Sequence, residues 1–549
     1  MVDRLRRGRA RVELRFDDPS QTPDVGLLLV AELADRLDLV GTLDRHIGPV
    51  KQRRRGVGGG ALVMALAESM LVGGDFLCDL DTLRADTAGA ALRTIACPPA
   101  PTTAAGLARR FGPAQLRGIE TGLAKVTARA VGLLPAPRRQ GLEAVRPTVD
   151  LDPTDVEVYG SHKQGVGWTY AGKRCGRPVL VCWAEAGVAL AAELLAGNQD
   201  ARPIAPGLVR RALAALPPGL GRPRVRADSG LFARLFARQV AHAAVAADAD
   251  FAIAAKRNPA VWRAIHAVPD DAWTPARGMP GAEVAGVAYA PAGWPEGTYA
   301  VVRRVRVGAA DVSADPRARR RRTFDPGQLR LALGGQLDQL YAYSIIVTNI
   351  DDDPVSLEAW FRERAQIEER IKDSKLGMAL RHLPSGSAQV NAVWMWAALL
   401  ALNCSVLLQA LGGIDACGRA HGKRLRRELI GVPGRLVRHA GQLLVRLSPR
   451  YAYLDQVRQR LAALPAPAGR PAPEPDQACQ RQQAPPEHAR ASASCAGCPG
   501  QPRQHHSKLP NPATPSSIAV RSRFSHTPGA RLIVDAGSCP TARSPYPRI

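Results

Sequence analysis

The order of apolar runs and helical patterns between residues 147 and 258 restricts the possible folds more than any other feature of the chain. The stretch RPVLVCWAEAGVALAAELLAGN contains two apolar runs that turn near Glu185–Gly187, which predicts two adjacent strands. A helix, a strand, a second helix and a further strand are predicted to follow. Neighbouring strands followed by alternating helices and strands predict a mixed α/β fold.

Two aspartates stand at the ends of predicted strands in this region. The stretch RPTVDLDPTDVEVYG alternates apolar and polar residues and predicts a strand that carries Asp152, and Asp228 follows another predicted strand in VRADSGLF. An Asp at a strand end, followed by small residues, can direct its carboxylate into an open crevice. Asp is also common in turns and helix caps, so either motif alone favours an ordinary structural role.

A third carboxylate lies in the charged stretch WFRERAQIEERIKDSKLG, residues 360–377. The stretch has no Pro, and its Gly stands at the end, so it predicts one continuous helix. Its residues Arg364, Glu368 and Lys375 would lie on one face at 3.6 residues per turn. Taken alone, that face is most simply a solvated stripe of Arg–Glu and Glu–Lys pairs, each worth about 0.2–0.5 kcal/mol.

Three carboxylates on separate elements suit metal-assisted phosphoryl transfer. Mg²⁺ prefers oxygen ligands, and two such ions about 3.5–4 Å apart can activate a water and stabilise a leaving oxygen. In this hypothesis Asp152, Asp228 and Glu368 hold the metal, while Arg364 and Lys375 contact phosphates.

The charge of the chain agrees with a polyanionic partner. Lys and Arg outnumber Asp and Glu by 74 to 49, a formal net charge of +25, which favours nucleic acid or an acidic membrane surface. The N-terminal stretch MVDRLRRGRARVELRFDD lacks the apolar region of a signal peptide, and the 10 cysteines form no regular framework. We therefore expect a protein of the reducing cytoplasm.

The most apolar stretch, residues 392–413, raises the question of a membrane span. Its unbroken apolar run ends at Leu402, and Asn403, Ser405 and Gln409 interrupt the remainder. A span requires about 20 mostly apolar residues. A helix buried in a soluble core is the favoured interpretation, with no membrane as partner.

The three acidic motifs, in this order, resemble those of bacterial insertion-sequence transposases of the DDE class. Within that class the chain resembles the IS-four superfamily, and most closely its IS-thirteen-eighty group. VDLDPTD and RADSGLF are similar to the two Asp motifs of that group, and EERIKDSK to the end of its Glu helix. The family signature Tyr-x2-Arg-x3-Glu-x6-Lys is matched in spacing by four residues, namely Phe361, Arg364, Glu368 and Lys375.

The resemblance implies an RNase H-like catalytic core with a β-rich insertion between the second Asp and the Glu. It implies Asp152, Asp228 and Glu368 as catalytic and metal-binding residues, with two Mg²⁺ or Mn²⁺ ions. Asp150 and Asp155 are rivals to Asp152, which the family's Asp-x-Thr spacing to Thr154 favours. The residues implied to contact the DNA backbone or support the site are Phe361, Arg364, Lys372, Lys375 and Thr154.

The implied partners are the terminal inverted repeats and the target DNA, both double-stranded, bound by a homodimer at the bacterial nucleoid. In relatives an aromatic of the insertion stacks on a flipped base, a role open to Trp262, Trp273 or Trp294, although each is more simply a packing residue. Phe361 replaces the family Tyr and removes a hydroxyl, so we expect weaker DNA positioning with the chemistry retained.

Composition and patterning divide the chain into segments along these lines. The segments are 1–140, helical and expected to bind DNA, with an ordinary helical domain as the alternative; 141–258, the first part of the catalytic core; 259–336, a β-rich insertion; 337–413, the second part of the core with the Glu helix; 414–464, a basic helical segment; and 465–549, a Pro-rich tail expected to be disordered.

Cut-and-paste transposition is the function that the resemblance implies, and other functions stay open on sequence alone. One is an RNase H-like nuclease that acts on structured DNA without joining strands. Another is a degenerate copy that binds the repeats without catalysis, which Phe361 and the unusual tail favour and the intact set of three carboxylates argues against. The last is a membrane protein that uses the apolar stretch.

Overall fold

The structure is a computed structural model that describes residues 4–7, 10–52, 56–232, 234–313, 315, 323–415 and 419–467. All of these lie in one compact unit, and the second unit, residues 485–549, lies outside them. The tail that was expected to be disordered, 465–549, therefore falls outside the described residues except for its first three positions.

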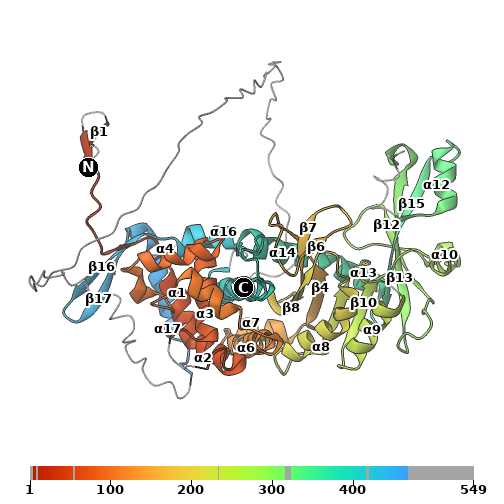
Figure 1. Ribbon diagram of the computed structural model, residues 1–549. Coiled ribbons are helices and arrows are strands. Elements are labelled where there is room, and N and C mark those ends of the chain that lie inside the picture. The colour runs from red at the N-terminus through yellow and green to blue at the C-terminus, as the bar shows by residue number, and fades with distance from the viewer. Residues whose placement is uncertain are drawn as a thin grey trace, which may run out of the picture. The chain divides into compact units, whose positions relative to one another are not determined.

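Helices dominate the N-terminal region, as the apolar spacing predicted, and Figure 1 shows α1, α2, α3 and α6 grouped together. The helix α3 is apolar on all sides and almost entirely buried, and it packs against the long helix α15, Ala388–Gly412. The helices are α1 Leu27–Arg36, α2 Leu39–Ile47, α3 Gly59–Val72, α4 Leu80–Ala85, α5 Pro101–Ala108, α6 Pro113–Gly132 and α7 Ala136–Glu143. Three short strands precede them: β1 Arg4–Arg7, β2 Ala10–Glu13 and β3 Gln21–Thr22.

A large mixed sheet forms the centre of the structure, with the strand order β11-β12-β13-β15-β10-β9-β4-β7-β5. The strands β4, β9 and β10 are parallel neighbours, and β7 and β15 flank them in the antiparallel sense. The predicted strand pair is confirmed, because β7 ends at Trp183 and β8 begins at Val188. The bounds are β4 Thr148–Pro153, β5 Val156–Glu157, β6 Gly167–Trp168, β7 Arg174–Trp183, β8 Val188–Ala196, β9 Arg224–Ala227 and β10 Asp250–Ala254.

Alternation along β4 divides the sheet into two different faces. Val149 and Leu151 are fully buried and belong to the main core cluster, which also contains residues of helices α8, Ala205–Ala215, and α9, Arg234–Val245. Asp150 and Asp152 project from the opposite face, because successive side chains of a strand alternate. The helices α13 and α14 cover that polar face.

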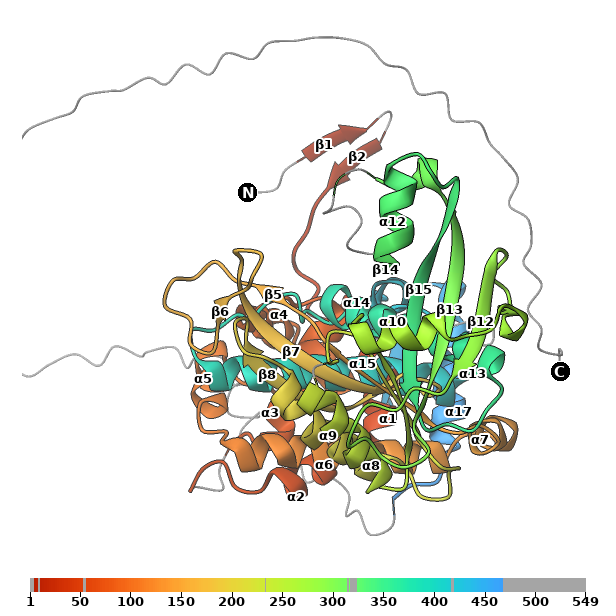
Figure 2. The same cartoon turned by 90° about the vertical axis from the view of Figure 1, so that its right-hand side faces the viewer.

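The β-rich insertion shares the central sheet. Strand β15, Gln339–Thr348, pairs with β13 along its whole length, and its last residues also pair with β10. Figure 2 shows β13 and β15 as long neighbouring strands, so the boundary expected at residues 336 and 337 falls just before a strand shared by both parts. The insertion comprises α10 Pro259–His266, β11 Thr274–Pro275, β12 Ala282–Val287, β13 Tyr299–Gly308, β14 Thr323–Phe324 and α12 Pro326–Leu333.

The helix predicted for residues 360–377 is confirmed, except that a 3₁₀ turn, Glu363–Ala365, divides it into two parts. Helix α13 begins earlier, at Pro354, because Asp353 caps it by accepting a hydrogen bond from Ser356 N at 3.0 Å. It ends at Arg362, a 3₁₀ turn follows, and α14 occupies Gln366–Leu376. Arg364 lies within this 3₁₀ turn, and it lines the same cleft as Glu368 of α14.

The basic helical segment predicted for 414–464 is wrong over its middle part. Residues Gly434–His439 and Gln442–Arg446 form an antiparallel hairpin, β16 and β17, and β3 pairs with β16. Ala440 and Gly441, with φ of 49° and 76°, form the two-residue turn between these strands. Among the described residues of this segment, the main helical parts are α16, Gly422–Leu425, the following π-helical turn Arg426–Ile430, and α17, Tyr453–Ala462, and a short 3₁₀ turn, Pro449–Tyr451, precedes α17.

The left-handed conformation of Ala440 predicts a stabilising substitution. An L-residue with a Cβ atom pays roughly 1–2 kcal/mol in this conformation, and Asn-Gly is the favoured pair for such turns. Ala440→Asn is therefore expected to raise the free energy of unfolding by about 1 kcal/mol in urea denaturation. Gly441→Ala, at φ 76°, is the matched control and should lower it. Equal stability of the two variants would contradict this account of the turn.

One helix among the described residues, α15, is long and apolar enough to cross a membrane. A bent pair, α3 with the segment Leu77–Ala85, passes the same test only if its two parts are taken as one span. The most apolar window of α15 is 94% buried within the protein, as in the core helix of a soluble protein. Asn403 of this helix accepts a hydrogen bond from Ala189 N and donates one to Ala189 O, at 2.8 and 3.0 Å.

Candidate active site

Strand register places two of the predicted carboxylates side by side. In the parallel pair β4–β9, Leu151 lies opposite Ala227, so Asp152 and Asp228 are the next residues of their strands at the same sheet edge. The carboxylate of Asp228 accepts hydrogen bonds from Gly230 N at 3.0 Å and Leu231 N at 3.3 Å. This Asx turn ends the strand and holds the Asp228 carboxylate at the edge.

The environment of Asp152 connects it to both other carboxylates. Its side chain is 18% exposed, and Arg364 Nη2 donates to Asp152 Oδ1 at 2.8 Å. Burial raises the pKa of Asp152 to about 6, Arg364 opposes this change, and the negative charges of Asp228 and Glu368 add to it. The three predicted residues therefore share one electrostatic environment, in which negative charge is incompletely neutralised.

Glu368 is exposed on α14 and lines a cleft with a volume of about 1070 Å³. Ser229, which follows Asp228, lines the same cleft, as do Phe361 and Arg364. The cleft continues along β13 and β15, so it connects the acidic edge of the sheet with the insertion.

The donor set suits a hard divalent cation, because all three side chains offer carboxylate oxygens and repel one another. Within the described ranges, no group of three His, Cys, Asp or Glu side chains is close enough to hold a metal ion together. Arg364 instead supplies the positive charge next to Asp152. The residues thus fit a metal in chemistry, and binding would require the carboxylates to converge further.

Asp150 and Asp155, the rivals to Asp152, have other partners. Asp150 forms a two-pronged ion pair with Arg226, with distances of 2.7 and 2.8 Å, and both side chains are only 1% exposed. Asp155 pairs with Arg177 at 2.7 Å. The geometry therefore favours Asp152 as the site residue of this strand.

The supporting residues predicted from the signature lie around the site in different ways. Lys375 Nζ donates to Asp155 O at 2.8 Å, and burial lowers the pKa of its ammonium group. Thr154 N donates to Pro178 O at 2.8 Å. Phe361 packs against an apolar cluster that contains Leu357 and Val301, and Lys372 is exposed.

The three tryptophans proposed to stack on a flipped base are packed against protein side chains. Trp262 contacts the ring of Tyr343 edge-on at 5.5 Å, and the guanidinium of Arg304 lies 4.1 Å from the ring of Trp273. Trp294 contacts Phe251 at 5.6 Å. As far as the structure describes it, the lining of the cleft includes none of the three.

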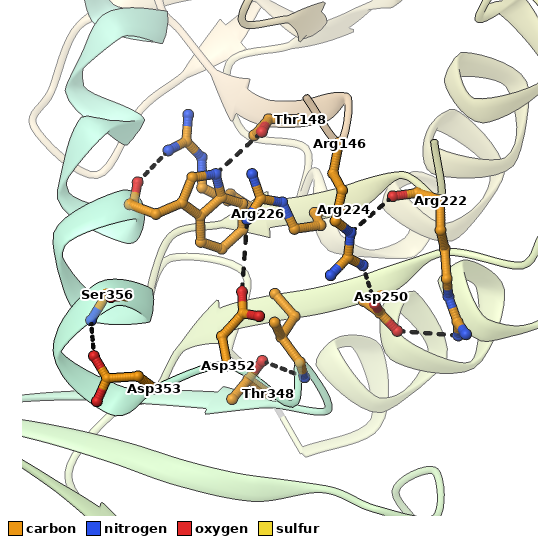
Figure 3. A network of polar contacts seen from close by, with 12 residues as sticks. Arg146, Thr148, Arg222, Arg224, Arg226, Asp250, Thr348, Asp352, Asp353 and Ser356 are labelled. Atoms are coloured by element: carbon orange, nitrogen blue, oxygen red, sulfur yellow. Dashed lines mark hydrogen bonds and ion pairs between the residues drawn. The ribbon is translucent and has the colours of Figure 1, made fainter. Parts of the chain in front are cut away.

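Sequence reasoning did not single out Arg226, although it contacts several elements of the site. Besides Asp150, its Nη1 atom donates to Trp360 O, and its guanidinium lies 4.9 Å from the Trp360 ring. Figure 3 shows Arg224 and Arg226 near Thr148, whose Oγ1 accepts a hydrogen bond from Trp360 Nε1 at 3.1 Å. An Arg inside a four-residue strand, two positions before Asp228, was the available signal.

The cleft is lined by several arginines. Arg303 and Arg362 are bound by the buried carboxylate of Glu358, with N–O distances of 2.5 and 2.9 Å. Arg257 and Arg306 are exposed. The exposed arginines place positive charge in the cleft beside the acidic sheet edge, which suits an anionic polymer.

A family model described as "Transposase DDE domain group 1" matches residues 6–467 of the chain. The chain belongs to this family, and it is a transposase, an enzyme of DNA transposition that binds DNA and uses divalent metal ions as DDE transposases generally do.

A structure described as a piggyBac transposase synaptic complex with hairpin DNA is similar to this chain at 10% identity, over 80% of this chain and 82% of that chain, with a TM-score of 0.35. No curated protein matches the chain in a sequence comparison.

Proposed function

We propose that this transposase moves a bacterial insertion sequence by a cut-and-paste route, as a member of the IS-four superfamily close to its IS-thirteen-eighty group. The observation that carries the proposal is the parallel pair β4–β9, which brings Asp152 and Asp228 to one edge of the sheet. Glu368 lies on the helix after α13 and acts on Asp152 electrostatically. This arrangement supports an RNase H-like core with a three-carboxylate site.

Asp152, Asp228 and Glu368 would hold the divalent cations, proposed to be two Mg²⁺ or Mn²⁺ ions. When bound, such ions activate a water and stabilise the leaving oxygen of a phosphodiester. Arg364 is placed to move from Asp152 to a DNA phosphate, because its guanidinium suits both anions. Arg257 and Arg306 would hold the backbone of the DNA in the cleft.

The proposed partners are the terminal inverted repeats and then the target DNA, bound by a homodimer that brings two element ends together. The helical region 1–140 and the basic hairpin β16–β17 are the proposed repeat-binding parts. The proposed location is the nucleoid of the bacterial cytoplasm.

Incubation of the full chain with labelled element-end DNA and Mg²⁺ tests this proposal. Metal-dependent cleavage at the element end, followed by joining of the freed 3′ end to target DNA, is the expected result. Cleavage without joining would instead assign a nuclease. Repeat binding without cleavage would assign a degenerate repeat-binding protein, a candidate that the position of Arg364 on Asp152 favours.

Protons and metal compete for the carboxylate of Asp152, which predicts that Mg²⁺ affinity depends on pH. The pKa of Asp152 in the folded protein is about 6, above the ordinary value of 3.8. Protonated Asp152 therefore stabilises the folded state, and this contribution is fully present below about pH 4 and is lost as the pH rises through about 6. Metal requires the carboxylate, so Mg²⁺ affinity should fall about tenfold per pH unit below about pH 6.

The shift of the melting temperature with Mg²⁺, measured between about pH 5 and pH 7.5, checks this prediction. The shift should be large at the upper pH and small at the lower one. Asp152→Asn should remove most of the shift at both values. A shift that is the same in the variant and the unsubstituted protein would assign the metal to another place.

A further inference from the structure

We infer that Arg226 is the positioning residue that sets the three carboxylates of the site relative to one another. It acts through a buried node, defined here as Asp150, Arg226 and Trp360. This inference rests on the proposed metal-binding role of Asp152, Asp228 and Glu368, and it adds a residue that touches none of the reacting atoms.

The node joins the two strands that lead to the aspartates with α13, the helix that precedes the Glu368 helix. Arg226 belongs to β9, and its Nε and Nη2 atoms bind both carboxylate oxygens of Asp150 on β4 at 2.7 and 2.8 Å. Its remaining terminal nitrogen, Nη1, donates to the carbonyl oxygen of Trp360 on α13, the helix that leads into α14. One guanidinium group thus contacts the strands of both aspartates and the helix before the glutamate.

Strand geometry transmits the position of the node to the site. Asp150 stands two residues before Asp152, and Arg226 stands two residues before Asp228, so each pair shares one face of the sheet. Two residues of a strand span roughly 7 Å. A change in the spacing of β4 and β9 at the node would therefore also change the distance between the carboxylates of Asp152 and Asp228, which lie only two residues further along.

The ring of Trp360 is held from several sides, which anchors α13 against the sheet. The guanidinium carbons of Arg224 and Arg226 lie 4.2 and 4.9 Å from the ring centre. The indole Nε1 donates to Thr148 Oγ1 of β4 at 3.1 Å. The arginine Arg224 is in turn 3.8 Å from Asp352, just before α13, as drawn in Figure 3.

The chemistry of the node favours a role in orientation over one in stability. A buried ion pair is often no more stabilising than well-packed apolar side chains of similar volume, because both charges lose their hydration. Its geometry is nevertheless specific, since the planar fork of Arg matches a carboxylate and a carbonyl at once, which Lys cannot do. An apolar pair would fill the space without fixing the angle between strand and helix.

Two sets of variants of the full chain separate positioning from folding. The double variant Arg226→Met with Asp150→Leu removes the charges and keeps the volume, and Arg226→Lys keeps the charge and loses the fork. Asn403→Leu is the matched control, because Asn403 is also buried and joins α15 to β8 by two hydrogen bonds. Folding of each variant is checked by circular dichroism and its melting temperature.

The readouts are the dissociation constant for Mn²⁺, from the electron paramagnetic resonance of free Mn²⁺, and the cleavage of element-end DNA. Both Arg226 variants should bind Mn²⁺ about 10- to 100-fold more weakly, the range typical of residues that orient metal ligands. At saturating Mn²⁺ they should lower kcat and leave KM for DNA unchanged. Asn403→Leu should change the melting temperature alone.

The inference is overturned if a folded double variant binds Mn²⁺ and cleaves DNA as the unsubstituted protein does. It is also overturned if Arg226→Lys loses no more activity than Asn403→Leu at an equal folded fraction. The variants Glu368→Gln and Asp152→Asn distinguish failure of the proposed metal site from failure of the positioning role alone. If neither of these weakens Mn²⁺ binding, the proposed metal site itself fails, and the positioning role fails with it.

Discussion

Glu368→Gln is expected to abolish metal-dependent cleavage of element-end DNA, with a loss of about 1,000-fold or more. The substitution keeps the size of the side chain and removes one negative ligand oxygen from the proposed site. Glu368 is exposed on α14, so the fold should not change. Gel-based cleavage rates with Mg²⁺, together with DNA binding measured in the absence of metal, provide the test.

Glu369→Gln is the matched control, because Glu369 is the next residue of the same helix and is also exposed. Among the residues that the structure describes, Glu369 forms one ion pair, a long one of 3.9 Å to Arg370. We expect cleavage within about threefold of the unsubstituted protein for this variant. A Glu368→Gln protein that binds and cleaves DNA normally would remove Glu368 from the site.

Arg226→Met alone is expected to lower the free energy of unfolding by about 3–5 kcal/mol. The substitution leaves the carboxylate of Asp150 in the core without its partner, and burial already raises the pKa of that group. Adding Asp150→Leu should restore most of the loss, because the unpaired charge is then gone. Urea denaturation at neutral pH measures all three proteins.

Arg84→Met measures how much free energy of unfolding is lost when an ordinary surface ion pair is removed. Arg84 and Asp81 form a surface ion pair at 2.7 Å with side chains 39% and 55% exposed, so its loss should cost less than about 1 kcal/mol. If Arg226→Met is as mild as Arg84→Met, the interior around Asp150 tolerates an unpaired charge or admits water. If the double variant is as unstable as the single one, the loss comes from packing.

The turn between β7 and β8 and the strands that carry the two aspartates could be predicted from sequence, because their signals are local. Apolar and β-branched residues with a turn at residues 185–187 specify a strand pair without reference to the rest of the chain. The same local reasoning failed for β16 and β17. There Arg and Leu, which are common in helices, favoured a helix, and the turn at Ala440 and Gly441 was not anticipated.

The break between α13 and α14 was also beyond local reasoning. Nothing in residues 360–377 excludes a continuous helix, since Pro is absent and the only Gly is terminal. The helix divides where Arg364 meets Asp152 of β4 and where Trp360 meets Arg226 of β9. These contacts join residues more than a hundred positions apart, so only the folded chain contains them.

The sequence by itself determined the chemistry available to this protein: three carboxylates in a fixed order, an α/β core around them, and an excess of positive charge for a polyanion. Tertiary structure alone decided which aspartate of β4 is buried with an arginine and which one stands at the sheet edge. It also decided that the insertion shares the central sheet. The physical reason is that strand alternation and helix period depend on near neighbours, whereas burial, ion pairing and register depend on which distant segments pack together.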